Sequence, residues 1–182
     1  MVKIDRPQIL NDTQGATIMA WIRYSWDDYP DDEETRLEVM EKFGSFWINI
    51  RRDSNRVRVG FRSGETCEMA GSQGAAVERR DTVDTLEPGV WTHVAATFDR
   101  AQQALRIYID GEEAALERIT PLCTPNPDEH PLVIGARDAD NSACPVCPDA
   151  FFFGTIDEVL IFSEALSAER IDQLVACRTT ED

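Results

Sequence analysis

Positive charge is scarce in this sequence of 182 residues. Lysine occurs only at Lys3 and Lys42, and arginines bring the cations to 18 against 34 aspartates and glutamates, which gives a formal net charge of −16. Phosphate backbones and anionic lipid headgroups are bound mainly through Lys and Arg side chains. The composition therefore argues against nucleic acid and against an anionic membrane surface as partners.

Long apolar runs are also missing. No stretch of 18 apolar residues occurs, so the sequence predicts no membrane-spanning helix and no membrane insertion. Residues 1–6 lack the charged start and apolar core of a secretory signal. The length fits one domain, residues 1–182, which is either a cytosolic protein or a module excised from a larger multidomain chain.

Short alternating segments dominate what is present. In residues 46–50, for example, Phe46, Ile48 and Ile50 alternate with Trp47 and Asn49, as in a strand covered on one face. Strands are predicted on this basis at 17–24, 46–50, 57–61, 91–98, 105–109, 131–135 and 154–162. The acidic stretch 27–34 is predicted to be a loop, and 63–83 a long loop or a weak edge strand.

A helical pattern occurs only near the end of the sequence. Ser167 suits an N-cap, Leu166 and Ile171 occupy the positions of a hydrophobic staple, and apolar residues then recur at helical spacing. Many short strands followed by one terminal helix predict an all-β fold, an antiparallel sandwich of two sheets with one short C-terminal helix.

Several segments occur in an order that resembles the laminin G-like, concanavalin A-like jelly-roll domains. They are residues 91–99 (WTHVAATFD), 105–111 (LRIYIDG), 131–135 (PLVIG), 154–162 (GTIDEVLIF) and 165–169 (ALSAE). The resemblance covers residues 17–175, and 39–50 is similar to the third strand of the family. It implies two curved sheets in face-to-face contact, in a module of a larger secreted, periplasmic or cell-surface protein. The module itself is expected to be monomeric in isolation.

Catalysis is not expected. Glucanases of this fold resemble one another in a Glu-x-Asp-x-(x)-Glu strand, which this sequence lacks. Asp157 and Glu158 are adjacent, and Glu38 and Glu41 are three residues apart, so regular alternation would place each pair on opposite faces. The two histidines, His93 and His130, have no neighbours that suggest a triad.

Calcium is the cofactor that the resemblance implies. In many domains that this chain resembles, the Asp of the Gly-x-x-Asp-Glu segment, here Asp157, is a ligand of one structural Ca²⁺. The alternative is that Asp157 accepts hydrogen bonds from backbone amides or an arginine. For the acidic loop 27–34 a solvated surface is the preferred interpretation over a cation site.

Trp26 and Tyr29 are the candidate ligand-binding residues. Trp26 directly precedes the acidic loop and Tyr29 lies within it, and exposed aromatic faces can stack on sugar rings while neighbouring carboxylates accept hydroxyl protons. Inward packing of Trp26 at the end of a strand is the alternative.

The cysteines predict an oxidising compartment. Cys67, Cys123, Cys144 and Cys147 lie in predicted loops, as disulfides that close long loops do. Five cysteines allow fifteen arrangements of two bridges and one thiol, and five free thiols in a reducing compartment are the alternative.

Taken together, the sequence predicts a non-catalytic module that binds a glycan or another protein, next to neighbouring domains of a larger chain. A secreted glycoside hydrolase and a purely structural adhesion domain are the alternatives.

Overall fold

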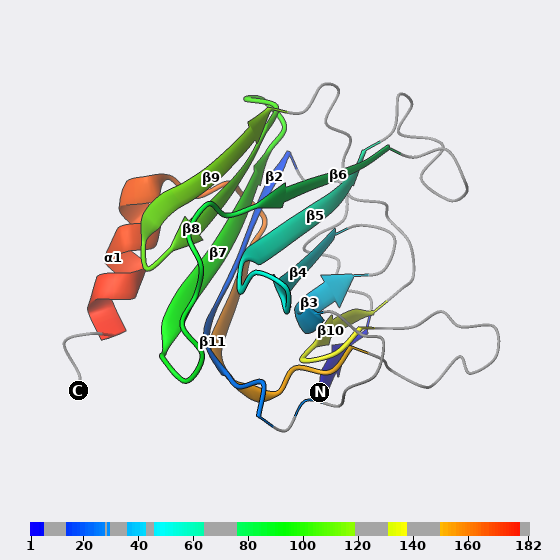
Figure 1. The fold of residues 1–182 in the computed structure, drawn as a ribbon. Helices are drawn as coiled ribbons and strands as arrows, with labels where there is room; N and C mark the ends of the chain where they lie inside the picture. The colour runs from blue at the N-terminus through cyan, green and yellow to red at the C-terminus, as the bar shows by residue number, and fades with distance from the viewer. Residues whose placement is uncertain are drawn as a thin grey trace.

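The computed structural model describes residues 1–5, 14–27, 29, 36–42, 46–63, 76–118, 131–137 and 150–178, with the backbone alone at 61–63, 76–79 and 178. These residues form two antiparallel sheets and one helix (Figure 1). The elements are β1 (Val2–Ile4), β2 (Gly15–Tyr24), β3 (Arg36–Lys42), β4 (Phe46–Arg51), β5 (Val57–Ser63), β6 (Ala76–Asp81), β7 (Thr92–Asp99), β8 (Ala104–Ile109), β9 (Glu112–Arg118), β10 (Leu132–Ile134), β11 (Gly154–Phe162) and α1 (Ala168–Arg178).

The two sheets confirm the predicted sandwich. Sheet A has the strand order β1-β10-β3-β4-β5-β6, and sheet B has the order β11-β2-β7-β8-β9. The predicted strands correspond to β2, β4, β5, β7, β8, β10 and β11, while β1, β3 and β9 were not among them. The segment 39–50, which resembles one strand of the family, spans the end of β3 and most of β4. The segment 63–83 contains the edge strand β6. Every pairing between neighbouring strands of the described chain is antiparallel, as in the predicted fold. Consecutive strands pair from β3 to β6 and from β7 to β9, while β1–β10, β10–β3, β11–β2 and β2–β7 join segments far apart in sequence.

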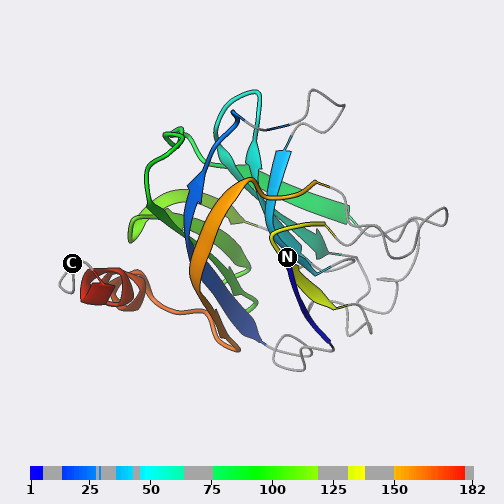
Figure 2. The ribbon, with the colours of Figure 1, turned by 90° about the horizontal axis from the view of Figure 1, so that it is seen from below.

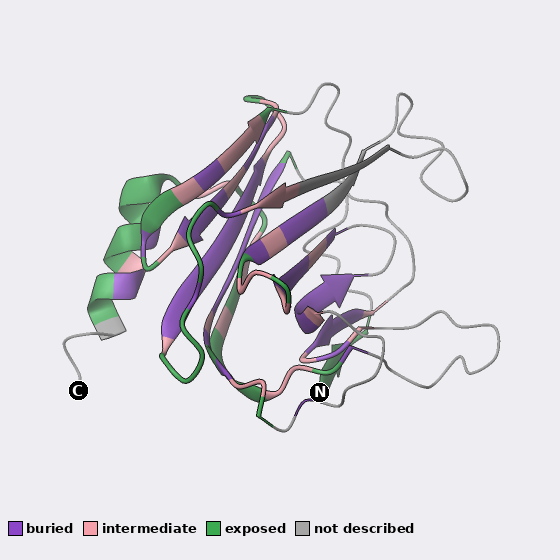
Figure 3. Cartoon of the chain, viewed as in Figure 1, coloured by how far each residue is buried: buried purple, intermediate pink, exposed green. Residues whose placement is uncertain are grey.

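The main core lies between the sheets, where apolar side chains at alternate positions of the strands face one another. In β2, Ile18, Ala20 and Ile22 are buried against sheet A. They meet Ile48 and Ile50 of β4, which are also fully buried. Figure 3 shows this buried layer running along both sheets. Burial of apolar side chains on both inner faces is therefore what joins the two layers.

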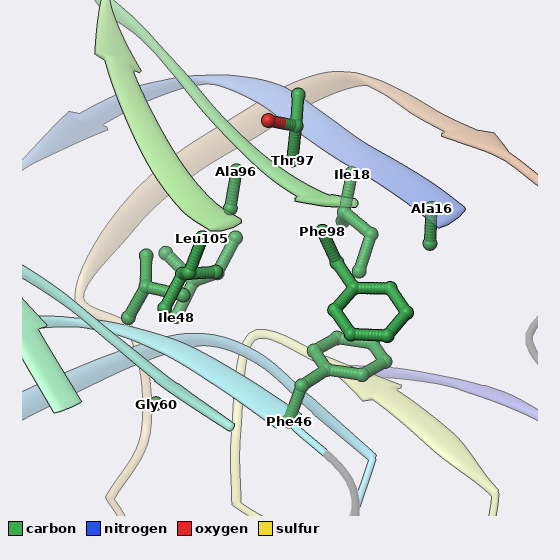
Figure 4. A pocket seen from close by; sticks show the side chains of 10 residues that line it. Ala16, Ile18, Phe46, Ile48, Gly60, Ala96, Thr97, Phe98 and Leu105 are labelled. Atoms are coloured by element: carbon green, nitrogen blue, oxygen red, sulfur yellow. The ribbon is translucent and has the colours of Figure 1, made fainter. Parts of the chain in front are cut away.

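A small gap remains inside this core. It measures about 20 Å³ and lies between Phe46 of sheet A and Phe98 of sheet B, with Ala16 and Leu105 also in its wall (Figure 4). A space of this size is about that of a single water molecule, and the apolar wall offers a water no hydrogen-bond partners. The gap is therefore a packing defect and not a ligand site.

Helix α1 covers the outer face of sheet B, on the side away from sheet A (Figure 2). Ile171 is fully buried in a second apolar cluster with Met19, Ala95 and Tyr108, which point outward from β2, β7 and β8. The Ser167 hydroxyl accepts a hydrogen bond from the Arg170 amide at 3.3 Å, which confirms the predicted N-cap. No helix in the described part of the chain is long and apolar enough to cross a membrane.

Candidate functional site

A bulge in β3 changes which side chains share a face. Glu38 lies opposite Asn49 and Glu41 lies opposite Trp47, and the register shifts between Glu38 and Met40. Asn49 and Trp47 are two residues apart on β4, so they project from the same face of sheet A, and so do Glu38 and Glu41. The expectation that these two glutamates lie on opposite faces is therefore wrong.

The extra residue in the bulge is Val39. Leu37, Val39 and Met40 are all fully buried in the inter-sheet core, so two consecutive apolar residues face inward between the two glutamates. Burying both of them requires the strand to depart from strict alternation. The pattern Glu-apolar-apolar-Glu at residues 38–41 is the sequence signal that would have indicated the bulge.

Both carboxylates are removed from water. Glu38 is 1% exposed and Glu41 is 8% exposed. Burial, followed by repulsion from Glu41, raises the pKa of Glu38 well above its usual value, and Arg36 and Arg137 act in the opposite direction. The Arg36 guanidinium lies 3.2 Å from Glu38 Oε2, and Arg137 lies 3.9 Å from Glu41 Oε2.

Some oxygen atoms of this cluster have no hydrogen-bond partner. Glu38 Oε1 and Asn49 Oδ1 are buried acceptors without a donor, although the Asn49 side chain hydrogen-bonds to Glu38. A buried polar atom left unpaired costs about 1–3 kcal/mol, so such atoms mark places where stability has been given up. Both atoms are buried, so they belong to the interior of this cluster and not to its solvent-facing part.

The cluster continues across sheet A as a row of polar side chains. Asn49 on β4 lies opposite Arg58 on β5, which in turn lies opposite Asp81 on β6. Arg58 and Asp81 form a two-pronged ion pair, with Nε–Oδ1 at 2.5 Å and Nη2–Oδ2 at 2.8 Å. Their side chains are 23% and 31% exposed, so the row runs from buried on β3 to accessible on β6.

Trp47 is the aromatic residue of this face. It lies opposite Gly60 on β5, and a Cβ atom added to Gly60 would be 1.9 Å from two carbons of the indole ring. The missing side chain of Gly60 therefore makes the room that the half-buried ring occupies. Trp47, Arg58 and Asp81 together give the outer face of sheet A an aromatic group beside hydrogen-bonding groups, which is a common composition of ligand sites.

Trp26 and Tyr29 lie outside this face, in a cluster of aromatic side chains. Tyr29 is 7% exposed and its hydroxyl donates to the Arg36 carbonyl, while the Trp26 indole donates to Asn55 Oδ1 at 2.7 Å. The two rings meet edge to face, with centroids 5.2 Å apart. These contacts explain both residues through packing, and a ligand role for them stays a prediction.

Asp157 lies on the outer face of sheet B, opposite Trp21 on β2. It is exposed, and its Oδ1 accepts the Glu158 amide at 2.8 Å, within an irregularity of β11 where Glu158 has a φ of 47°. The described residues include no group of three or more His, Cys, Asp or Glu side chains that could hold a metal ion. They do not form a calcium site around Asp157 by themselves, and calcium binding stays a prediction.

The disulfide candidates Cys67, Cys123, Cys144 and Cys147 lie outside the described residues. Cys177 lies on α1 and is exposed. His93 is 3% exposed beside Trp21, with ring centroids 5.5 Å apart, and burial lowers its pKa to about 4. A neutral, buried imidazole packed against an indole fits the structural role expected for this residue.

The family of the chain is shown by a match that covers almost all of its residues. A laminin G-like family model, described as the concanavalin A-like lectin/glucanases superfamily, matches residues 1–172. The chain therefore belongs to this superfamily, as the sequence resemblance indicated. Among curated proteins, no match to this chain is found.

Solved structures with the same architecture include binding proteins. One from Bacteroides ovatus, described as a "putative carbohydrate binding protein", has a TM-score of 0.62 at 19% identity over 88% of this chain and 40% of its own. The binding domain of Paraclostridial Mosquitocidal Protein 1 has a TM-score of 0.69 at 14% identity, over 97% of this chain and 40% of its own. A heptameric SAP-like pentraxin from Limulus polyphemus has a TM-score of 0.61 at 13% identity, over 92% of this chain and 72% of its own. At these identities the likeness concerns the fold, and the chain spans about two fifths of the length of the first two.

Proposed function

We propose that this chain is a glycan-binding module of a secreted or cell-surface protein, and that the outer face of sheet A is its binding surface. The observation that carries the proposal is the accessible part of this face, where the half-buried Trp47 ring lies beside the partly exposed ion pair of Arg58 and Asp81. Sugars offer hydroxyl groups and an apolar ring face, which match charged hydrogen-bonding groups next to an indole. The carbohydrate-binding description of the Bacteroides ovatus protein supports the same class of ligand.

Trp47 provides the direct test. In a glycan-array screen followed by titration calorimetry, Trp47→Ala is expected to weaken binding of the array hits by about tenfold or more, and Trp47→Phe to retain most of it. Trp91→Ala is the matched control, because Trp91 is also half-buried and contacts Arg23 at 5.1 Å outside this surface. Equal binding by Trp47→Ala and the wild type would contradict the proposed surface, and an array without hits would contradict the proposed function and leave a protein ligand or a structural role.

A hydrolase is the second candidate, because Glu38 and Glu41 share a face. A carboxyl group with a raised pKa next to a second carboxylate is the arrangement that supplies a general acid in glycoside hydrolysis. We infer binding without turnover, so a reducing-sugar assay on the array hits is expected to give no product. Turnover that is lost in Glu38→Gln would instead assign the pair a catalytic role.

A further inference from the structure

The backbone around the bulge in β3 is fixed on both edges of the strand. Along one edge, the Glu38 amide donates to the Ala150 carbonyl at 3.2 Å, and the Gly135 amide donates to the Val39 carbonyl at 2.9 Å. Along the other edge, Glu38 and Glu41 are in register with β4. Bonds on both edges oppose any shift of β3 that would move the two carboxyl groups apart. Glu38 and Glu41 are therefore held on the same face of sheet A.

The two carboxyl groups are poorly compensated inside this face. Glu38 Oε1 is buried without a hydrogen-bond partner, and Glu41 is 8% exposed. Two carboxylates that are close together and removed from water repel each other and lack hydration, so one of them retains a proton more readily than an exposed glutamate does. Glu38 is the more deeply buried of the two, and burial and repulsion from Glu41 raise its pKa. Glu38 is therefore the main holder of this proton.

Positive charge approaches the glutamate pair from its margins. Arg36 contacts Glu38 at 3.2 Å with a side chain that is 28% exposed, and Arg137 approaches Glu41 to 3.9 Å with a side chain that is 34% exposed. Water therefore screens part of the charge of both arginines. The other charged groups that the ladders place on this face near the pair are Lys3 on β1, Arg51 on β4 and Arg58 on β5.

The glutamate pair lies directly beside the proposed binding surface. Glu41 is the cross-strand partner of Trp47, and Glu38 is that of Asn49. Side chains that are opposite each other in an antiparallel ladder have Cβ atoms about 4.5–5.5 Å apart. A change in the charge or the hydration of Glu41 therefore acts on the indole ring through a direct neighbour.

We propose that Glu38 and Glu41 hold a single proton between them when the Trp47 surface binds its ligand, and that loss of this proton at higher pH weakens binding. The inference rests on the glycan-binding function proposed above. With both carboxyl groups ionised, the second charge has to be hydrated or turned towards Arg36 or Arg137, which disturbs the packing of Glu41 beside Trp47. Affinity is therefore constant while the pair keeps its proton and falls as the pH rises through the upper titration step of the pair.

Carbon NMR of the glutamate side-chain carboxyl groups tests the shared proton without any ligand. In protein labelled with ¹³C at these carbons, one signal of the wild type is expected to titrate more than about one pH unit above an ordinary glutamate. Glu38→Gln and Glu41→Gln assign the two signals. In each variant the remaining carboxyl group should titrate at a lower pH than the upper step of the wild type, because its charged neighbour is gone.

Titration calorimetry with a neutral glycan from the array tests the coupling to binding. The affinity of the wild type is expected to fall about fivefold or more as the pH rises from about 5 to 9. Glu38→Gln and Glu41→Gln should both bind with an affinity that is nearly independent of pH over this range. Glu112→Gln is the matched control, since Glu112 is an exposed glutamate on β9 of sheet B, and this variant should keep the pH dependence of the wild type.

The outcomes separate the two proposals. Titration of both carboxyl groups within about one pH unit of an ordinary glutamate, or titration of Glu41 that is identical with and without Glu38, would overturn the shared proton. A wild-type affinity that stays constant with pH, or a fall that persists in both glutamine variants, would overturn the regulation while leaving glycan binding in place. An array without hits would overturn the proposed function, and the carboxyl signals would still decide whether the pair shares a proton.

Discussion

Gly60 shows how one residue shapes the proposed surface. The indole of Trp47 occupies the space directly above its Cα, so glycine is required there for steric reasons and not for a special backbone angle. The two residues are partners in the β4–β5 ladder. The position of the aromatic ring on sheet A thus depends on the absence of a side chain on the next strand.

Replacing Gly60 with alanine should displace the Trp47 ring. The new methyl group would lie 1.9 Å from two ring carbons, and we expect a loss of about 1–3 kcal/mol in the free energy of unfolding. Urea denaturation followed by tryptophan fluorescence measures this loss. The double variant with Trp47→Ala should remove most of it, because the two residues interact directly. An equal loss with and without Trp47 would show that the cost of the methyl group arises elsewhere.

At the scale of elements, helix α1 depends on the sheet that it covers. It has 11 residues, and helices shorter than about 12–15 residues are marginal in water on their own. Its burial is concentrated on Ile171 and Val175, which are 0% and 7% exposed. The helix is therefore stabilised by docking on sheet B more than by its own propensity.

Ile171→Ala tests this dependence. The substitution would leave a cavity beside Met19, Ala95 and Tyr108, and an unfolding free energy lower by about 2–4 kcal/mol is expected from urea denaturation. Gln173→Ala, on the exposed side of the same helix, should change stability by less than about 0.5 kcal/mol. Similar losses in the two variants would contradict a helix that is held by its buried face.

The β3 bulge is the element that most affects the proposed site. It lets Val39 and Met40 both enter the core while Glu38 and Glu41 both leave it. A regular strand would bury one of the glutamates between the sheets or expose one of the apolar residues. The carboxylate pair is thus a consequence of how the core is filled.

At the scale of the whole molecule, two buried titratable groups give stability opposite dependences on pH. The pKa of His93 falls to about 4 on folding from an ordinary 6.5, so the unfolded chain binds more protons between these values. The contribution of His93 to the free energy of unfolding is complete above pH 6.5 and is lost as the pH falls towards 4. The pKa of Glu38 is raised on folding, so its contribution to the free energy of unfolding is complete below about pH 4.5. That contribution is lost as the pH rises through the pKa of Glu38 in the folded state.

His93→Asn should therefore flatten the acid side of the stability profile. For the wild type we expect the His93 contribution, up to about 3 kcal/mol, to disappear between pH 6.5 and 4 in thermal melts. Asparagine has no charge to acquire, so the variant should lose less stability than the wild type over this range. An identical decline in both proteins would show that His93 is solvated in the folded state. Glu38→Gln, as a comparison, should change the slope in the opposite sense.

The sequence by itself determined the elements that depend on local pattern. Alternation predicted the strands that became β2, β4, β5, β7, β8, β10 and β11, and Ser167 with the apolar spacing after it predicted α1. The dipeptide Asp110-Gly111 is a sequence signal typical of a tight turn, and both residues have positive φ in the structure, of 50° and 88°. These features are set by neighbouring residues along the chain, which a sequence displays directly.

Only the tertiary structure decided which side chains meet. The bulge at Val39 placed Glu38 with Glu41, the register of β4 and β5 placed Trp47 over Gly60, and the pairing of β5 with β6 placed Arg58 beside Asp81. The short β1 pairs with β10, a strand distant in sequence. Register between strands depends on how both sheets fill a shared core, and that condition involves residues too far apart for a local pattern to encode.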